Sequence, residues 1–516
     1  MAAAPWALRR RLRPVAVRSF GAVSILVVAA VPVLAYLVVA VLRIGYPYEL
    51  SHFEGSMVEV TARVATGQPL YARPTLEFTP WPYPPLYFWL TGAVASVTGV
   101  SLLPLRLVSL VASLIVLLLI AVIIRRAGGS GLAAAVGVGL YAASYRVSGA
   151  WADTARVDSV LLAFLLSAVA VGVRAGTAAG GAAVGGLLFL AFLTKQTAVL
   201  VAMPIVCWLL VFRRPAGLTA AIVLIGGIAG STLLGDLLTG GWYSPAVVRQ
   251  LLGQPWAPRW LWEFWLVDLL LPFGLAIGLG VWLVRRFRPV EFRWATVRQW
   301  RRPTEVSFLA AAGVGLLIAA LAGRIHEGGY VNVSMPAHAG LAIGVAMIFA
   351  GALRTGRLGG RLLVAVAAIL LLQFGAMTLW RLHVVPSAAD RAAGDQLIAD
   401  LRALPGTVVM PGHPYYLRLA GKPVTASSIA IFDVLASREG RGRDAVTALL
   451  PWSLDGVSAV VLDDSSQAGL FGAALARDFT LASSAFVPDG TLVQVTDQPR
   501  RPTLLYLRTT PAPGPS

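Results

Sequence analysis

The sequence has little charge. Only 13% of its 516 residues are charged, whereas a soluble globular domain carries roughly 25%. Hydrophobic residues make up 57% of the chain, and the mean hydropathy is +0.76. These values exclude a soluble globular enzyme, a disordered chain and a fibrous repeat, and they leave a membrane protein with several spans.

Cysteine and lysine are also scarce. The single cysteine, Cys207, lies in an apolar run, so the chain has no disulfide framework and no CxxC metal or redox motif. Of the 42 basic residues only Lys195 and Lys422 are lysine, so arginine carries the net charge of +18. Because most arginines stand between apolar runs and form no continuous patch, we expect no nucleic-acid partner.

Apolar runs long enough to cross about 30 Å of hydrocarbon recur over the first 380 residues. The first, Phe20–Leu42, is too long for the core of a signal peptide and predicts an uncleaved span. Pro84–Val100 is ambiguous, because it opens with two prolines and contains two glycines. The other predicted spans lie at about 105–124, 131–147, 157–173, 178–194, 197–212, 217–238, 262–284, 305–322, 336–353 and 362–380.

The arginines decide whether 84–100 crosses the membrane. If it does not cross, the arginine-rich turns all fall on the side of the N-terminus, as the positive-inside rule requires. These turns hold Arg125 and Arg126, Arg174, Arg213 and Arg214, seven arginines from Arg285 to Arg302, and Arg354, Arg357 and Arg361. We therefore predict about 11 spans (range 11–13) in the cytoplasmic membrane, with the N-terminus inside.

This topology divides the chain into three parts. Residues 1–18 form a basic cytoplasmic N-terminus, and residues 19–382 form the membrane domain with a large first outer loop at 43–104. Residues 383–516 form a small α/β domain outside the membrane. In that domain we expect helices at Ala388–Leu404 and Leu470–Arg477, and strands at Thr407–Met410, Val457–Asp463 and Thr491–Val495.

Polar residues from several distant loops meet on the outer side in this topology. Ionisable groups at membrane depth are costly and typically line a cavity, so this convergence is the main functional signal. The candidates are Glu49, Glu54, Arg63, Tyr83, Arg156, Asp158, Lys195, Gln196, Arg324, His326 and Asn332.

Each candidate also has a structural alternative. Glu54 is either a catalytic carboxylate or a partner of a helix dipole at the start of the helical stretch 56–65. Asp158 is either catalytic or a local ion-pair partner of Arg156. Lys195 either contacts a phosphate or extends to the membrane interface. His326 and Asn332 flank Gly328 and Gly329, which suit either close approach to a ligand or an ordinary turn.

Three short stretches resemble a known family. Phe53-Glu54-Gly55, Gly67-Gln68-Pro69-Leu70-Tyr71 and Tyr83-Pro84-Pro85-Leu86-Tyr87-Phe88-Trp89-Leu90 resemble the first outer loop of GT-C glycosyltransferases. The likeness is to glycosyltransferase family 39, which contains protein O-mannosyltransferases and lipid A aminoarabinose transferases. Arg156-Val157-Asp158 resembles a second acidic motif of that family, and the likeness covers residues 20–380.

The resemblance implies a polyprenyl-phosphate-linked sugar as donor and transfer with inversion on the outer face of the membrane. By position, Glu54 is the implied base for the acceptor hydroxyl. Two departures stand out, because many members have an acid at Phe53 and a basic residue or histidine at Tyr83. The candidates for contact with the donor phosphate are then Lys195, Arg324 and His326. Tyr83 is a further candidate for binding the donor.

The predicted enzyme is a hexosyl- or pentosyltransferase acting on a lipid, glycan or protein acceptor. A sugar on a lipid phosphate brings its own leaving group, which needs positive charge to depart, and the acceptor hydroxyl needs one base. This chemistry requires no cofactor, and a divalent metal stays an open alternative. Two other functions stay open: a transporter or lipid flippase, whose charges would line a pathway, and a catalytically silent GT-C relative.

Overall fold

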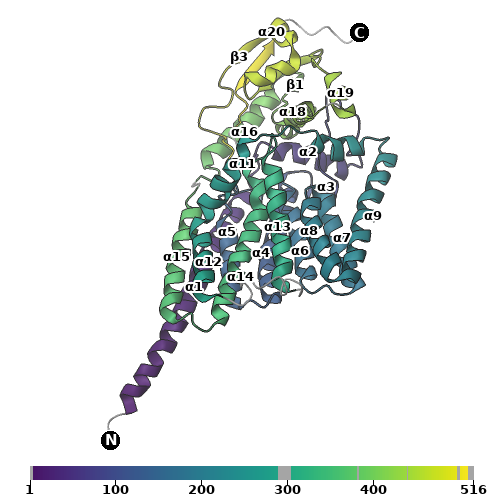
Figure 1. Cartoon of the computed structure of the whole chain (residues 1–516). Coiled ribbons are helices and arrows are strands. Elements are labelled where there is room, and N and C mark those ends of the chain that lie inside the picture. The colour runs from purple at the N-terminus through teal and green to yellow at the C-terminus, as the bar shows by residue number, and fades with distance from the viewer. Residues whose placement is uncertain (1–3, 289–303, 381–382, 439, 497–499, 510–516) are drawn as a thin grey trace.

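The computed structural model describes residues 4–288, 304–380, 383–438, 440–496 and 500–509. It shows a tall helical bundle with a smaller C-terminal part at one end and the N-terminus at the other (Figure 1). The bundle helices are α1 (Ala4–Ile44), α4 (Leu102–Arg126), α5 (Gly131–Ala143), α6 (Asp158–Gly172), α7 (Ala178–Thr194), α8 (Ala198–Phe212), α9 (Arg214–Leu238), α12 (Leu271–Phe287), α13 (Glu305–Arg324), α14 (Met335–Arg354) and α15 (Gly360–Thr378). Shorter elements connect them: α2 (Glu54–Ala65), α3 (Leu86–Thr98), η1 (Pro245–Arg249), α10 (Gln250–Leu252), α11 (Arg259–Glu263), η2 (Phe264–Leu270) and η4 (Val331–Ser334).

The predicted polytopic helical fold is confirmed. Each predicted span coincides with a helix, and seven described helical stretches are long and apolar enough to cross a membrane. Five further apolar helices have 10–17 residues. The chain is thus a multi-pass membrane protein, while the number of crossings stays a prediction.

Glycines allow some of these helices to pack closely. A side chain at Gly181 on α7 would meet the backbone of Ala216 on α9, and one at Gly185 would meet Ala220. Small residues spaced four apart let membrane helices approach at backbone distance. The glycine-rich sequence of α7 is therefore explained by its contact with α9.

The first outer loop leaves the bundle and returns to it at the same end. Arg106, in the first turns of α4, donates hydrogen bonds to the carbonyls of Tyr46 and Tyr48 just after α1, at 2.5 and 2.7 Å. Helix α3 has 13 residues and spans about 20 Å, short of the roughly 30 Å hydrocarbon core. Because α5, a predicted span, is equally short, helix length does not distinguish the two, and the topology of 84–100 stays a prediction.

The arginine-rich turns gather at the opposite end. Arg126 donates to Ala170, Arg213 donates to the carbonyls of Gly172, Val173 and Ala175, and Arg354 donates to Gly128. Cations at helix C-termini neutralise the exposed carbonyls. Some arginines that we predict on the cytoplasmic side lie outside the described part of the chain. These are the arginines of segment 289–303 and the side chains of the N-terminal arginines up to Arg13.

Residues 388–509, which we name the C-terminal unit, contain a four-stranded sheet of order β1-β2-β4-β3. Strand β1 runs parallel to β2, whereas β4 runs antiparallel to both its neighbours. The elements are α16 (Ala388–Ala403), β1 (Thr407–Val409), α17 (Pro414–Leu419), α18 (Ser428–Ala436), α19 (Arg441–Thr447), β2 (Val457–Leu462), η5 (Ser465–Phe471), α20 (Ala473–Asp478), β3 (Phe479–Ser483) and β4 (Leu504–Arg508).

The prediction of a strand at Thr491–Val495 was wrong. That segment is irregular, and Leu504–Arg508 takes the place between β2 and β3. Within this segment, the amide of Val493 donates to the Asp390 carboxylate at 3.2 Å and is therefore not available to a sheet. Thr496, directly after the segment, donates its amide to Leu50 of the first outer loop.

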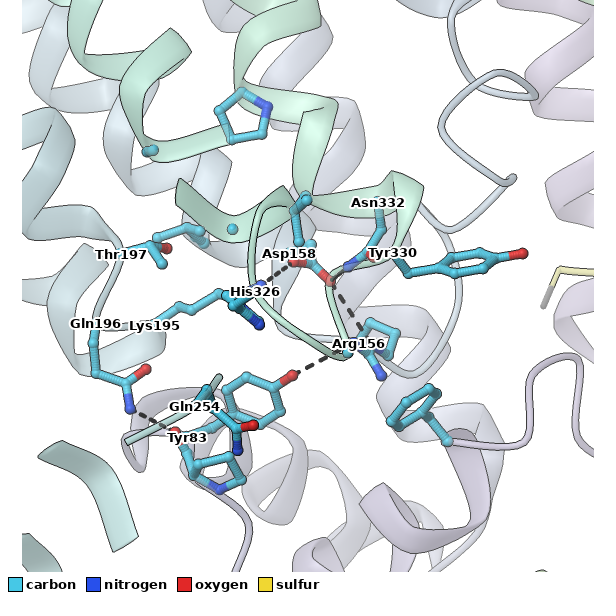
Figure 2. A pocket seen from close by; sticks show the side chains of 18 of the residues that line it. Tyr83, Arg156, Asp158, Lys195, Gln196, Thr197, Gln254, His326, Tyr330 and Asn332 are labelled. Atoms are coloured by element: carbon cyan, nitrogen blue, oxygen red, sulfur yellow. Dashed lines mark hydrogen bonds and ion pairs between the residues drawn. The ribbon is translucent and has the colours of Figure 1, made fainter. Parts of the chain in front are cut away.

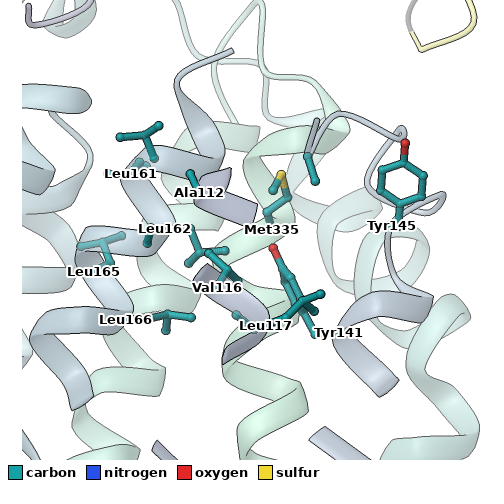
Figure 3. Close-up of a cluster of buried hydrophobic side chains, with 14 of the residues drawn as sticks. Ala112, Val116, Leu117, Tyr141, Tyr145, Leu161, Leu162, Leu165, Leu166 and Met335 are labelled. Carbon is teal, nitrogen blue, oxygen red and sulfur yellow. The ribbon is translucent and has the colours of Figure 1, made fainter. Parts of the chain in front are cut away.

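The C-terminal unit sits directly on the outer loops of the bundle (Figure 1). Ala426 donates its amide to Leu76, Arg438 donates to Gly253, and the indole of Trp151 donates to Thr496. Below these contacts, α4, α5, α6 and α14 enclose a core of packed aliphatic and aromatic side chains (Figure 3). This core provides a rigid base for the polar residues above it.

Candidate active site

A pocket lies at the end of the bundle opposite the arginine-rich turns, beneath the C-terminal unit. The start of α6, the end of α7, the loop between α13 and α14, and helix α18 all contribute side chains to it. It encloses about 1110 Å³ of space free of atoms, part of which is open to solvent. Seven predicted residues line it, namely Tyr83, Arg156, Asp158, Lys195, Gln196, His326 and Asn332.

Asp158 stands at the centre of this group, as Figure 2 shows. It is the first residue of α6, where the helix dipole favours a negative charge. Its carboxylate accepts hydrogen bonds from Lys195 at 2.8 Å and from Asn332 at 2.9 Å, and the Nε atom of Arg156 lies 3.7 Å away. Two cations thus lie beside one carboxylate at this end of the pocket.

Lys195 reaches the pocket because α7 ends there. Its backbone is extended where it caps α7, and its ammonium group also lies 5.8 Å from the ring centroid of Tyr83. The next residue, Gln196, donates to the carbonyls of Pro82 and Val247 and so ties the α7 end to the segment before Pro84. The Lys195 amine therefore contacts two other parts of the chain, the start of α6 at Asp158 and the Tyr83 ring.

The loop after α13 brings in His326 and Asn332. A side chain at Gly329 would meet the carbonyl oxygen of Gly323 at 2.4 Å, so this turn requires glycine. His326 is bonded through Nδ1 to the carbonyl of Glu327, and burial lowers its pKa. An imidazole held neutral offers a hydrogen bond rather than a full charge.

Aromatic side chains form one wall. The guanidinium of Arg156 lies over the rings of Phe53 and Trp151, 4.4 and 4.6 Å from their centroids. Trp151 stacks on Tyr330, and Trp81 stacks on Tyr83. These ring contacts fix the plane of the Arg156 guanidinium, and Tyr83 and Tyr330 line the pocket with it.

Glu54, the predicted base, lies outside the pocket lining and is fully buried. Arg106 donates to both of its oxygens, at 3.0 and 2.6 Å, and the amides of Leu50 and Ala155 complete the set at 2.7 and 2.8 Å. Since Ala155 directly precedes Arg156, these contacts support the loop that carries Arg156 and Asp158. A catalytic role for Glu54 stays a prediction, and its contacts favour a positioning role.

Three other candidates also lie outside the pocket lining. Arg324 pairs with Asp268 at 2.6 Å and covers the ring of Trp260. Glu49 pairs with His413 at 2.5 Å, and Arg63 covers the ring of Phe78. Each side chain is thus directed away from the group around Asp158, although Arg324 also donates to Gly329 and so supports the loop.

The structure adds pocket residues that the sequence did not single out. Gln250, Gln254 and Asp433 line the pocket from α10, its following turn and α18. Asp433 is the more informative one, because it stands in an otherwise apolar helix of the C-terminal unit. An isolated acid in an apolar stretch is a signal that the sequence did contain.

No group of three or more His, Cys, Asp or Glu side chains suited to a metal ion occurs within the described residues. In the pocket, the two oxygens of Asp158 already accept from Lys195 and Asn332. A divalent metal stays an open alternative.

Comparison with known proteins agrees with this architecture. Residues 82–233 match the sequence model of the family described as dolichyl-phosphate-mannose-protein mannosyltransferase. None of the curated protein sequences compared with the chain matches it. The match to the family model covers less than half of the chain, so it indicates a likeness to this family over that segment.

Solved structures show the same fold at low identity. ArnT from Cupriavidus metallidurans bound to undecaprenyl phosphate superposes with a TM-score of 0.59 at 15% identity, over 95% of this chain and 99% of that one. Its apo form gives 0.58 at 16% identity, over 95% and 98%. The oligosaccharyltransferase of Archaeoglobus fulgidus, tethered to an acceptor peptide, gives 0.50 at 12% identity, over 84% and 68%.

Proposed function

We propose that this protein transfers a sugar from a polyprenyl-phosphate donor to an acceptor at the outer face of the cytoplasmic membrane. The observation that carries the proposal is the pairing of Lys195 and Arg156 around the single carboxylate of Asp158 in a pocket at the end away from the arginine-rich turns. The similar fold of ArnT, which was solved with undecaprenyl phosphate, supports this choice of donor.

The pocket offers separate places for the two ends of such a donor. Its deeper wall is apolar, with Leu161 and Leu165 of α6, Ala319 of α13 and Pro336 of α14, and suits a polyprenyl chain. The polar end around Lys195 suits the phosphate, and the aromatic wall suits the sugar. A phosphate diester that leaves as a monoester gains negative charge, which preorganised cations stabilise as it develops.

The same geometry supports the proposed sidedness. The arginine-rich turns mark the cytoplasmic side under the positive-inside rule, and the pocket lies at the other end. In a Cys207→Ser background, Ala127→Cys should resist a membrane-impermeant maleimide in intact cells, while Asp444→Cys on exposed α19 should react. The reverse pattern would place the pocket in the cytoplasm.

Lys195 gives the direct test of transfer. Membranes containing the protein are supplied with the polyprenyl-phosphate sugars extracted from host cells grown on [14C]glucose, and label covalently joined to an acceptor is measured. Lys195→Met should lower transfer by about 10²–10³-fold, the loss typical of one preorganised group at a developing charge.

The other lysine of the chain provides the matched control. Lys422 lies outside the pocket lining and donates to the carbonyl of Leu404, so Lys422→Met should keep transfer near wild type. Label that changes sides without becoming attached to an acceptor would instead indicate a flippase, and full transfer by Lys195→Met would contradict the assigned phosphate site.

A further inference from the structure

An inverting transfer requires a carboxylate whose oxygens are available to the acceptor. Three carboxylates line the pocket: Asp158, Glu327 and Asp433. Asp158 already accepts from Lys195 and Asn332, and Glu327 is exposed to solvent. Asp433 is half-buried, and within the described ranges no side chain lies within hydrogen-bond or ion-pair distance of its carboxylate.

We propose that Asp433 is the base that accepts the proton of the acceptor hydroxyl, so that the C-terminal unit completes the active site. This inference rests on the proposed function. It supplies the acid that the resemblance leaves unassigned, because Phe53 stands where many family members have an acid. Glu54 is fully occupied by Arg106 and two backbone amides, and its contacts hold the loop of Arg156.

Helix α18 is fixed at several points, as a catalytic residue requires. The carbonyl of Asp433 itself accepts from Gln254 at 2.9 Å, a pocket residue labelled in Figure 2. Ser428, at the start of α18, donates its amide to Pro411 at 2.8 Å. Ile431 and Val434 are buried in the apolar core of the C-terminal unit, on the sides of α18 away from the pocket.

The electrostatic setting suits proton transfer near neutral pH. Burial raises the pKa of Asp433 to about 7, and the charge of Arg156 acts in the opposite direction. A base with a pKa near the working pH combines a useful ionised fraction with a real affinity for the proton. The other charged or titratable groups that line the pocket with it are Tyr83, Asp158, Lys195, His326, Glu327 and Tyr330.

The step balances without any other reactant. The acceptor oxygen forms a bond to the anomeric carbon of the donor as its proton passes to the Asp433 carboxylate. The bond between the anomeric carbon and the phosphate oxygen breaks, and its electron pair stays on the polyprenyl phosphate beside Lys195 and Arg156. Asp433 then returns the proton to solvent.

The experiment compares Asp433→Asn, Asp433→Glu and Asp444→Asn in the full-length protein. Asp444 is an exposed acid on the neighbouring helix α19 and serves as the matched control. Transfer is measured with the 14C-labelled polyprenyl-phosphate sugar pool, and binding is measured with undecaprenyl phosphate alone. Asp433→Asn should lose about 10²–10⁴-fold in transfer, the usual contribution of a general base, while its binding of undecaprenyl phosphate stays unchanged.

The pH dependence of transfer distinguishes a catalytic role of Asp433 from a structural one. Wild-type transfer should fall below about pH 7, and Asp433→Glu should retain part of the activity with a displaced acidic limb. His326→Gln should leave the position of that limb unchanged. A purely structural role of Asp433 would lower activity without moving the limb.

The possible failures are distinct. Wild-type-level transfer by Asp433→Asn, alongside loss of transfer in Lys195→Met, would overturn the role of Asp433 and leave the proposed function standing. Absence of both transfer and undecaprenyl phosphate binding in the wild-type protein would overturn the proposed function, and this inference with it.

Discussion

Two groups of charged residues lie a short way apart at the same end of the bundle, and they are built differently. In the first group, which holds Glu54 with Arg106 and Asp153 with Arg43, every carboxylate is buried against a guanidinium, and backbone amides or the Tyr145 hydroxyl complete its partners. In the second, around Asp158, Lys195 and Arg156 lie beside the carboxylate and also line a pocket. The comparison teaches that saturated charges position the loops, whereas charges with space in front of them bind the substrate.

The largest effect on stability should come from breaking a saturated pair. Arg106→Gln leaves the Glu54 carboxylate buried without its partner, which typically costs about 3–5 kcal/mol. Thermal unfolding in detergent should show a large fall in Tm. The double variant Glu54→Gln with Arg106→Gln removes both charges and should recover much of that loss.

The same double variant tests whether Glu54 acts as the base. If Glu54 only positions the loop of Arg156, transfer returns as stability returns. If the double variant folds like the wild-type protein but transfers no sugar, Glu54 acts in the chemistry itself and the distinction between the two groups fails.

Much of this comparison could not be predicted from the sequence. The helical bundle, the placement of Asp158, Lys195 and Asn332 at one end of it, and the first two strands of the C-terminal unit follow from hydropathy, charge and local pattern. The sequence does not show which carboxylate has all its hydrogen-bond partners, because Glu54 and Arg106 are 52 residues apart. An arginine within the apolar run 105–124 was nevertheless a usable signal, since such a charge requires a buried partner.

The position of the C-terminal unit on the bundle could not be predicted from the sequence either. Asp433 reaches the pocket only because α18 packs on the loops around Leu76 and Gly253, contacts that no local pattern encodes. The failed strand at 491–495 has the same origin, since the tertiary contact of Val493 with Asp390 overrides its propensity.

A third cluster sharpens the comparison through its pH dependence. His413 lies between Glu49 at 2.5 Å and Asp463 at 3.2 Å and joins the first outer loop to the C-terminal unit. Burial alone would lower the pKa of His413, but the two carboxylates raise it to about 10. Because the folded pKa lies above the unfolded value of about 6.5, this stabilisation is complete below about pH 6.5 and is lost as the pH rises through about 10.

Stability measured across that window provides the test. The Tm of the wild-type protein should fall between pH 7 and pH 10, and His413→Gln should lower Tm at neutral pH and flatten this slope. A variant slope as steep as that of the wild type would mean that another group is responsible.

The smallest effect should come from an accessible pair. Arg418 of α17 donates to Glu59 of α2 at 2.8 Å, and the Arg418 side chain is 37% exposed. Accessible ion pairs contribute about 0–1 kcal/mol, so Arg418→Gln should change Tm little, and less still in high salt. A loss as large as that of Arg106→Gln would remove the contrast between saturated buried charges and accessible ones.

The most direct test of the account is a cryo-EM map of the protein with undecaprenyl phosphate. The account predicts phosphate density within hydrogen-bond distance of Lys195 Nζ and beside the Arg156 guanidinium, with the lipid chain along α6 and the Asp433 carboxylate facing the free side of the phosphate. Phosphate density among the arginines at the opposite end of the bundle, with the pocket at Asp158 empty, would contradict it.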